Sequence, residues 1–97
     1  MLNRDTILAI LRQQEDVLRA RHKVRAIGLF GSYVRGQQMA RSDVDLLVEF
    51  SEPVSLIEFL RLEYYLTEII GHKVDLVAKT ALRPSIGERI LDEVAYP

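Results

Sequence analysis

The chain has 97 residues, of which 48% are hydrophobic and 28% are charged, a balance typical of a folded globular protein rather than a disordered one. Its net charge is −1 and its 13 Lys and Arg residues form no single run, so the composition does not favour direct binding to nucleic acid. The lack of cysteine excludes disulfides and thiolate metal sites. We expect a single domain over residues 1–97.

The N-terminal residues are polar early and do not resemble a signal peptide. No apolar run approaches the roughly 20 residues that a membrane-spanning helix needs. Together these features predict a cytoplasmic protein with no membrane partner.

The first half of the chain predicts a helix, a strand and a turn. Asn3 or Asp5 can cap a helix that continues to about His22, with apolar residues along one side. The apolar run over residues 24–30 predicts a strand that is buried on both faces. Residues 32–36 predict a short helical turn, which a polar loop connects to the next strand.

The second predicted strand, residues 43–50, separates apolar from acidic side chains by its alternation. One face carries Val44, Leu46, Val48 and Phe50. The other face carries Asp43, Asp45, Leu47 and Glu49. We expect the first face to lie in the core, with the carboxylates opposite it.

Ser55 and Glu58 form a capping box that predicts the start of a long helix ending at Gly71. The stripe expected to face the core, called the inner stripe below, consists of Phe59, Leu62, Leu66, Ile69 and Ile70. A second stripe, called the outer stripe, consists of Leu56, Ile57, Leu60 and Tyr64. One core does not need two apolar stripes on a surface helix. Either the chain's own C-terminal segment or a partner therefore covers the outer stripe.

A third strand is predicted from Val74 to Val77, and a final helix begins near Pro84. Asp75 stands inside this short apolar strand, where an acidic residue is disfavoured by propensity and costly to bury. Because helices alternate with strands, we expect an α/β fold with a small mixed β-sheet flanked by helices.

The residues suited to catalysis or ligand binding lie between Gly31 and Asp45. Asp43 and Asp45 are two residues apart on one strand, so their carboxylates share a face and repel each other. A cation removes this cost, and Mg²⁺ commonly takes one or two protein carboxylates plus substrate phosphates. Gly31 allows a phosphate to approach the backbone because it has no Cβ, and Ser32 adds a hydroxyl at a helix start. The stretch predicts a site for a metal and a triphosphate.

The third strand can complete this site. If it lies beside the second strand, Asp75 comes next to the other two carboxylates, and the three together need cations. The two histidines, His22 and His72, have no second ligand at a metal spacing, so a zinc site is not expected. The glycines form neither a G-x-G-x-x-G motif nor a P-loop.

Gly31-Ser32, ten further residues and then Asp43-x-Asp45 resemble the signature of the DNA-polymerase-β-like nucleotidyltransferases. The segment Phe-Gly-Ser-Tyr-Val-Arg-Gly, the short chain and the later segment Lys73–Val77 resemble more narrowly the minimal nucleotidyltransferases, the MNT-domain antitoxins of HEPN-domain toxins. The resemblance covers residues from about 24 to about 93. It implies the polymerase-β-like nucleotidyltransferase core.

The resemblance also implies an enzyme, a protein adenylyltransferase that transfers AMP from ATP to a tyrosine of a cognate HEPN toxin and so acts as its antitoxin. Asp43, Asp45 and Asp75 would be the catalytic residues and would bind two Mg²⁺ ions. Gly31 and Ser32 would bind the nucleotide through its β- and γ-phosphates. Arg35 could add positive charge there, but the glycine after it indicates a turn, so we leave Arg35 outside this set.

The residues themselves leave two alternatives open. One is a stand-alone nucleotidyltransferase that acts on a small hydroxylated molecule. The other is an antitoxin that acts by binding alone, without catalysis. If the chain is the antitoxin of a HEPN toxin, we expect a hetero-oligomer of antitoxin and toxin, with a homodimer as the alternative.

Overall fold

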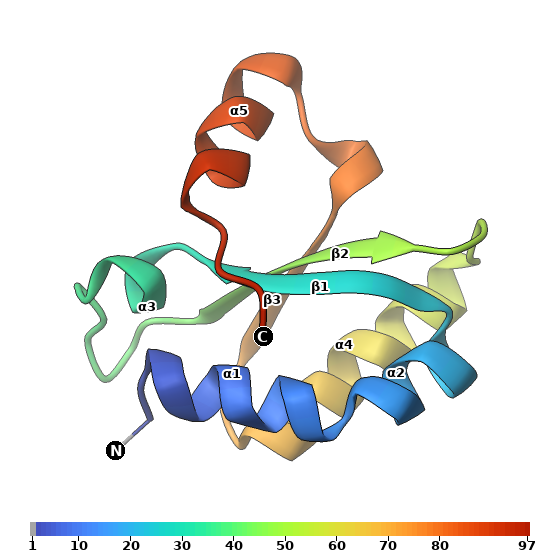
Figure 1. Cartoon of the computed structure of the whole chain (residues 1–97), viewed down its shortest axis with the longest axis horizontal. Coiled ribbons are helices and arrows are strands. Elements are labelled where there is room, and N and C mark those ends of the chain that lie inside the picture. The colour runs from blue at the N-terminus through green and yellow to red at the C-terminus, as the bar shows by residue number, and fades with distance from the viewer. Residues whose placement is uncertain (1) are drawn as a thin grey trace.

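The structure is a computed structural model that describes residues 2–97, and Figure 1 shows its elements in chain order. They are α1 (Arg4–Gln13), α2 (Glu15–His22), β1 (Val24–Phe30), α3 (Ser32–Arg35), β2 (Val44–Phe50), α4 (Leu56–Ile70), β3 (Val74–Ala78), the 3-10 turn η1 (Lys79–Ala81) and α5 (Pro84–Glu93). The strands form one sheet in the order β1-β2-β3, with β1 and β2 antiparallel and β2 and β3 parallel. The predicted α/β fold with a small mixed sheet is confirmed.

The sheet separates a core side from an acidic side. Helices α1, α2 and α4 lie on one side of the sheet, and α5 lies on the other (Figure 1). The core is on the three-helix side and includes Val44, Leu46 and Val48 of β2, Ile7 and Leu11 of α1, Leu18 of α2, and Leu62 and Leu66 of α4. Because side chains alternate along a strand, the acidic face of β2 points toward the side of α5.

The N-terminal helix differs from the prediction at Gln14. The sequence predicts one helix to about His22, whereas the structure has two, separated at Gln14 (φ −97°, ψ 7°). The Gln14 side chain accepts a hydrogen bond from the Tyr65 hydroxyl of α4. Gln is a good helix former, so the local sequence carries no signal for this break. Asn3, one of the two predicted caps, does cap α1: its Oδ1 accepts a 2.9 Å bond from the Thr6 N–H.

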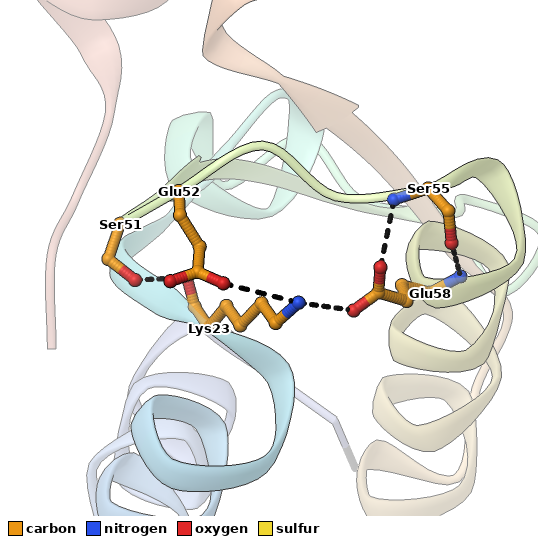
Figure 2. A network of polar contacts seen from close by, with 5 residues as sticks. All are labelled: Lys23, Ser51, Glu52, Ser55 and Glu58. Carbon is orange, nitrogen blue, oxygen red and sulfur yellow. Dashed lines mark hydrogen bonds and ion pairs between the residues drawn. The ribbon is translucent and has the colours of Figure 1, made fainter.

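Lys23 joins the corner between α2 and β1 to the start of α4 (Figure 2). The chain turns here with a left-handed φ of 59° at Lys23. The Lys23 ammonium lies 2.8 Å from Glu58 and 3.3 Å from Glu52, and its carbonyl accepts hydrogen bonds from the Ser51 N–H and hydroxyl. Lys23 and then Ser55 lower the pKa of Glu58 to about 2. This network holds the end of the sheet where β1 begins and β2 ends.

Helix α4 confirms the predicted capping box and inner stripe. The Ser55 and Glu58 side chains bond each other's backbone N–H groups, and the helix ends at Gly71. In the inner stripe Leu62, Leu66 and Ile70 are buried, and the other two members are partly buried. In the outer stripe the exposed fractions are 72% for Leu56, 63% for Ile57, 50% for Leu60 and 69% for Tyr64.

The C-terminal segment lies elsewhere. Ala95 pairs with Leu29 of β1, the Val94 and Tyr96 side chains lie against Gly28, and α5 is on the opposite side of the sheet from α4 (Figure 1). The interpretation that this segment covers the outer stripe is therefore wrong, and a partner is the alternative that remains. No helix within residues 2–97 combines the length and the hydropathy that crossing a membrane requires.

Truncating one leucine from each stripe should have very different costs. Leu62→Ala removes a fully buried side chain and should lower the free energy of unfolding by about 2–5 kcal/mol. Leu60→Ala makes the same chemical change at a half-exposed position and should alter it by no more than about 0.5 kcal/mol. Urea unfolding followed by circular dichroism measures both. Similar losses in the two variants would mean that the outer stripe also packs inside the folded chain.

Candidate active site

The pairing of β2 with β3 brings the predicted acidic residues together. Asp45 and Asp75 are direct partners in the parallel ladder, so their side chains leave the same face of strands that lie roughly 4.8 Å apart. Asp43 comes two residues before Asp45, just ahead of β2, and shares that face. Asp43 and Asp45 are half-buried, whereas Asp75 is exposed. All three carboxylates therefore belong to the acidic face, opposite the core.

Gly31 connects β1 to α3 and touches Asp45. Phe30, the last residue of β1, pairs with Asp45, and Gly31 follows it with φ 79° and ψ −154°, a conformation that is essentially restricted to Gly. A Cβ on Gly31 would overlap the Asp45 Oδ2 atom. Any other residue here would strain the backbone and push the Asp45 carboxylate out of its place.

The helical turn α3 begins directly after Gly31, as predicted. The Gly31 carbonyl accepts hydrogen bonds from the Val34 and Arg35 N–H groups, which closes the turn on itself. Ser32, the first residue of α3, is half-buried and stands next to the Gly31 backbone that faces Asp45. The two residues predicted to bind a triphosphate thus lie beside the acidic face.

Two charged residues outside the predicted set complete the surroundings. Glu93, at the end of α5, accepts a 3.0 Å hydrogen bond from the Gly31 N–H and bonds of 3.1 and 3.0 Å from Arg35 Nη1. Arg35 was expected to lie in a turn outside the nucleotide-binding set. Glu93 was not predicted from the sequence: it is 62 residues from Gly31 and ends an ordinary amphipathic helix. No local pattern marks Glu93 as a neighbour of the site.

The environment strongly perturbs Asp45. Burial raises the pKa of Asp45 from 3.8 to about 6, and the negative charges of Asp75, Asp43 and Glu93 act in the same direction, while Arg35 opposes them. A carboxylate with a raised pKa gains from a nearby cation, because the cation stabilises its charged form. The acidic face therefore has a physical reason to bind positive charge.

These acids fit a Mg²⁺ ion that arrives with a triphosphate. Within residues 2–97, no three His, Cys, Asp or Glu side chains converge tightly enough to form a complete metal cage. Mg²⁺ usually takes one or two protein carboxylates and fills its other positions with water and phosphate oxygens. Asp45 and Asp75 supply such a pair. Asp43 has only a weak ion pair to release, with its Oδ2 3.7 Å from the exposed Lys73 Nζ.

Comparison with known sequences points to one family. The family model described as "Nucleotidyltransferase domain" matches residues 11–96. The chain is also 48% identical over 96 residues to the protein adenylyltransferase MntA of Thermococcus cleftensis, and the match covers 99% of this chain and 97% of that relative.

Two solved structures share the fold over most of the chain. One is of a protein assigned as a minimal nucleotidyltransferase, with a TM-score of 0.74 and 36% identity over 91% of this chain and 93% of that one. The other is a crystal structure of a toxin–antitoxin with AMP-PNP, with a TM-score of 0.71 and 26% identity over 98% of this chain and 72% of that one. The arrangement of helices and strands around the acidic face is therefore shared with known proteins.

The raised pKa of Asp45 predicts how stability depends on pH when no metal is present. An unfolded Asp titrates near 3.9, and the folded value is about 6, so folding favours the neutral form. The contribution of protonated Asp45 to the free energy of unfolding is complete below about pH 4 and is lost as the pH rises through about 6. Asp45→Asn removes this dependence and should be more stable than the wild type at pH 7 by about 1–2 kcal/mol, allowing for screening by solvent.

Urea unfolding of both proteins in chelator-treated buffer at pH 4 and pH 7 measures this difference. The exposed Asp92→Asn variant removes one carboxylate elsewhere and serves as the matched control. An equal difference between Asp45→Asn and wild type at the two pH values would contradict the prediction.

Proposed function

Since the chain belongs to the nucleotidyltransferase domain family, we propose that it is a Mg²⁺-dependent protein adenylyltransferase that transfers AMP from ATP to a tyrosine of a cognate HEPN-type toxin and so acts as its antitoxin. The observation that carries this proposal is the position of Asp45 in the central strand. On one side it lies against Gly31, which follows β1, and on the other side it pairs with Asp75 of β3. A triphosphate site and a pair of metal-binding carboxylates then meet on one face of the sheet.

In this mechanism each residue has a distinct role. Asp43 and Asp45 would hold the metal ion that accompanies the triphosphate, and Asp75 would join them at a second ion. Bound Mg²⁺ supplies positive charge that stabilises the attacking and leaving oxygens. The Gly31 N–H and the Ser32 hydroxyl hold the β- and γ-phosphates. Asp75 is the most accessible of the three acids, which suits a residue that meets the acceptor hydroxyl and takes its proton.

The bond changes follow from these positions. The tyrosine oxygen attacks the α-phosphorus of ATP and forms a new O–P bond. The bond from that phosphorus to the bridging oxygen of the β-phosphate breaks, and pyrophosphate leaves. Arg35 and the Gly31 N–H both donate hydrogen bonds to the Glu93 carboxylate. With the phosphates held at Gly31, the charge of Arg35 would favour the departing pyrophosphate.

A protein acceptor is supported by the comparisons and by the surface. The Thermococcus relative is a protein adenylyltransferase, and a structural neighbour is a toxin–antitoxin with AMP-PNP. The outer stripe leaves four large apolar side chains exposed on α4, and such patches mark sites where proteins bind. Helix α4 is fastened to β3 by Glu63, whose Oε2 accepts a hydrogen bond from the Leu76 N–H. The Asp75 carboxylate lies on the face of the sheet opposite α4 (Figure 1), and β3 is an edge strand. A toxin on the outer stripe would therefore have to extend past β3 to bring a tyrosine to Asp75.

Substitution of single acids should separate nucleotide binding from transfer. Asp75→Asn should reduce AMP transfer to the purified toxin by about 10²–10⁴-fold, the usual contribution of a general base, while Mg-ATP binding changes only a few-fold. Asp45→Asn should lose both, because Asp45 holds the triphosphate's ion. Transfer of label from α-³²P-ATP and calorimetric titration with Mg-ATP measure the two properties.

The alternatives give different results in the same assay. A small-molecule enzyme would release pyrophosphate with a metabolite acceptor and leave the toxin unlabelled. An antitoxin that acts by binding alone would neutralise the toxin equally well with Asp45→Asn and Asp75→Asn. Asp16→Asn, an exposed carboxylate on α2, should behave as wild type throughout.

A charge in the outer stripe should weaken the complex with the toxin without unfolding the antitoxin. Leu60→Glu is expected to reduce toxin affinity by about tenfold or more, as for a residue central to an interface, while the melting temperature and Mg-ATP affinity stay near wild type. Size-exclusion chromatography and calorimetry measure the complex. Ala20→Glu places the same charge on the exposed face of α2 as a control. Undiminished toxin binding by Leu60→Glu would place the interface elsewhere.

A further inference from the structure

Glu93 fills an anion position beside the acidic face. Its carboxylate accepts the Gly31 N–H at 3.0 Å and two bonds from Arg35 Nη1 at 3.1 and 3.0 Å. Carboxylate and phosphate oxygens are interchangeable acceptors for such donors, since both form charge-assisted hydrogen bonds with N–H groups. Under the proposed function the Gly31 N–H binds the triphosphate, so the two anions would compete for the same donor.

The fold brings Glu93 to this position from the far end of the chain. Directly after α5, Ala95 exchanges two 2.8 Å backbone hydrogen bonds with Leu29. Val94 and Tyr96 pack against Gly28, where an added Cβ would crowd both side chains. These contacts fasten the end of α5 beside β1 and leave the Glu93 side chain next to Gly31. Figure 1 shows this tail descending from α5 across the sheet.

The Glu93 side chain can leave without this anchor moving. Its carboxylate is joined to the backbone through rotatable single bonds, and its side chain is 26% exposed, so it can swing into solvent while Ala95 stays paired. Arg35 is also partly exposed, at 48%, and can turn with it or stay with an incoming phosphate. The contact is thus a reversible one between two surface-accessible side chains and one backbone N–H.

Resting on the proposed function, we propose that Glu93 is an internal competitor of the nucleotide: its carboxylate occupies the place of a β- or γ-phosphate oxygen and must be displaced before the triphosphate binds. The apparent affinity of any ligand of this position is then reduced by the fraction of molecules in which Glu93 has left. The same reduction applies to pyrophosphate, so the returning carboxylate assists release of the leaving group.

A second role for the same contact gives the opposite prediction. If Glu93 instead holds Arg35 ready for the phosphates, its removal weakens nucleotide binding. If it only stabilises the fold, its removal lowers the melting temperature and leaves affinity unchanged. The sign of the change in affinity therefore distinguishes competition from positioning and from a purely structural contact.

The test is calorimetric titration of the purified chain with Mg-AMP-PNP and, separately, with Mg-pyrophosphate. Glu93→Gln should bind both about three- to tenfold more tightly than wild type, as expected when a competing state that holds most molecules is removed. Glu93→Asp keeps the charge but shortens the side chain, and it should also bind more tightly because its carboxylate reaches Gly31 and Arg35 less well. Circular dichroism melting verifies that each variant is folded.

Asp92→Asn is the matched control, since it removes an exposed carboxylate from the same turn of α5 and should bind both ligands as wild type does. Equal tightening in Asp92→Asn would overturn the proposal, because the gain would then come from net charge. Unchanged or weaker binding by folded Glu93→Gln and Glu93→Asp would overturn it while leaving the proposed function standing. If neither wild type nor variants bind either ligand, both proposals fail together.

Discussion

The acidic face depends on the contact between the Gly31 backbone and the Asp45 carboxylate. Gly31 can make the turn from β1 into α3 because it tolerates a φ of 79° and because it has no Cβ to overlap Asp45. The antiparallel pairing of Phe30 with Asp45 brings the two residues together, and the parallel pairing of Asp45 with Asp75 adds the next carboxylate. One residue of the central strand thus links both neighbouring strands to the site.

Two kinds of charged position lie around that contact: carboxylates that favour a cation, and hydrogen-bond donors that bind an anion. The carboxylates of the acidic face and the surrounding burial raise the pKa of Asp45 to about 6, which favours binding of a cation. A few ångströms away the Gly31 N–H and Arg35 form an anion position, which Glu93 occupies. The proposed ligand, a triphosphate with its metal ion, would bring the cation and the anion together.

Stability and function are separated across the sheet. The three-helix side buries the apolar residues that hold the fold together, and Lys23 fastens the end of the sheet where β1 begins (Figure 2). Helix α5 lies on the other side (Figure 1), and the acidic face of β2 points toward it because side chains alternate along a strand. Charged residues can therefore accumulate around Asp45 without disturbing the core. On the three-helix side, the outer stripe of α4 leaves four large apolar side chains exposed.

The sequence by itself determined the features that depend on local periodicity and spacing. Alternation along β2 separated the core face from Asp43 and Asp45, the capping box at Ser55 began α4, and the spacing of Gly31-Ser32 from the acidic pair indicated the family. Only the tertiary structure decided the break at Gln14, the exposure of the outer stripe and the position of Glu93. Each of these depends on contacts between segments far apart in the chain, such as Gln14 with Tyr65 and Gly31 with Glu93. Local side-chain patterns do not encode such contacts, because they arise from the path that the whole chain takes around the sheet.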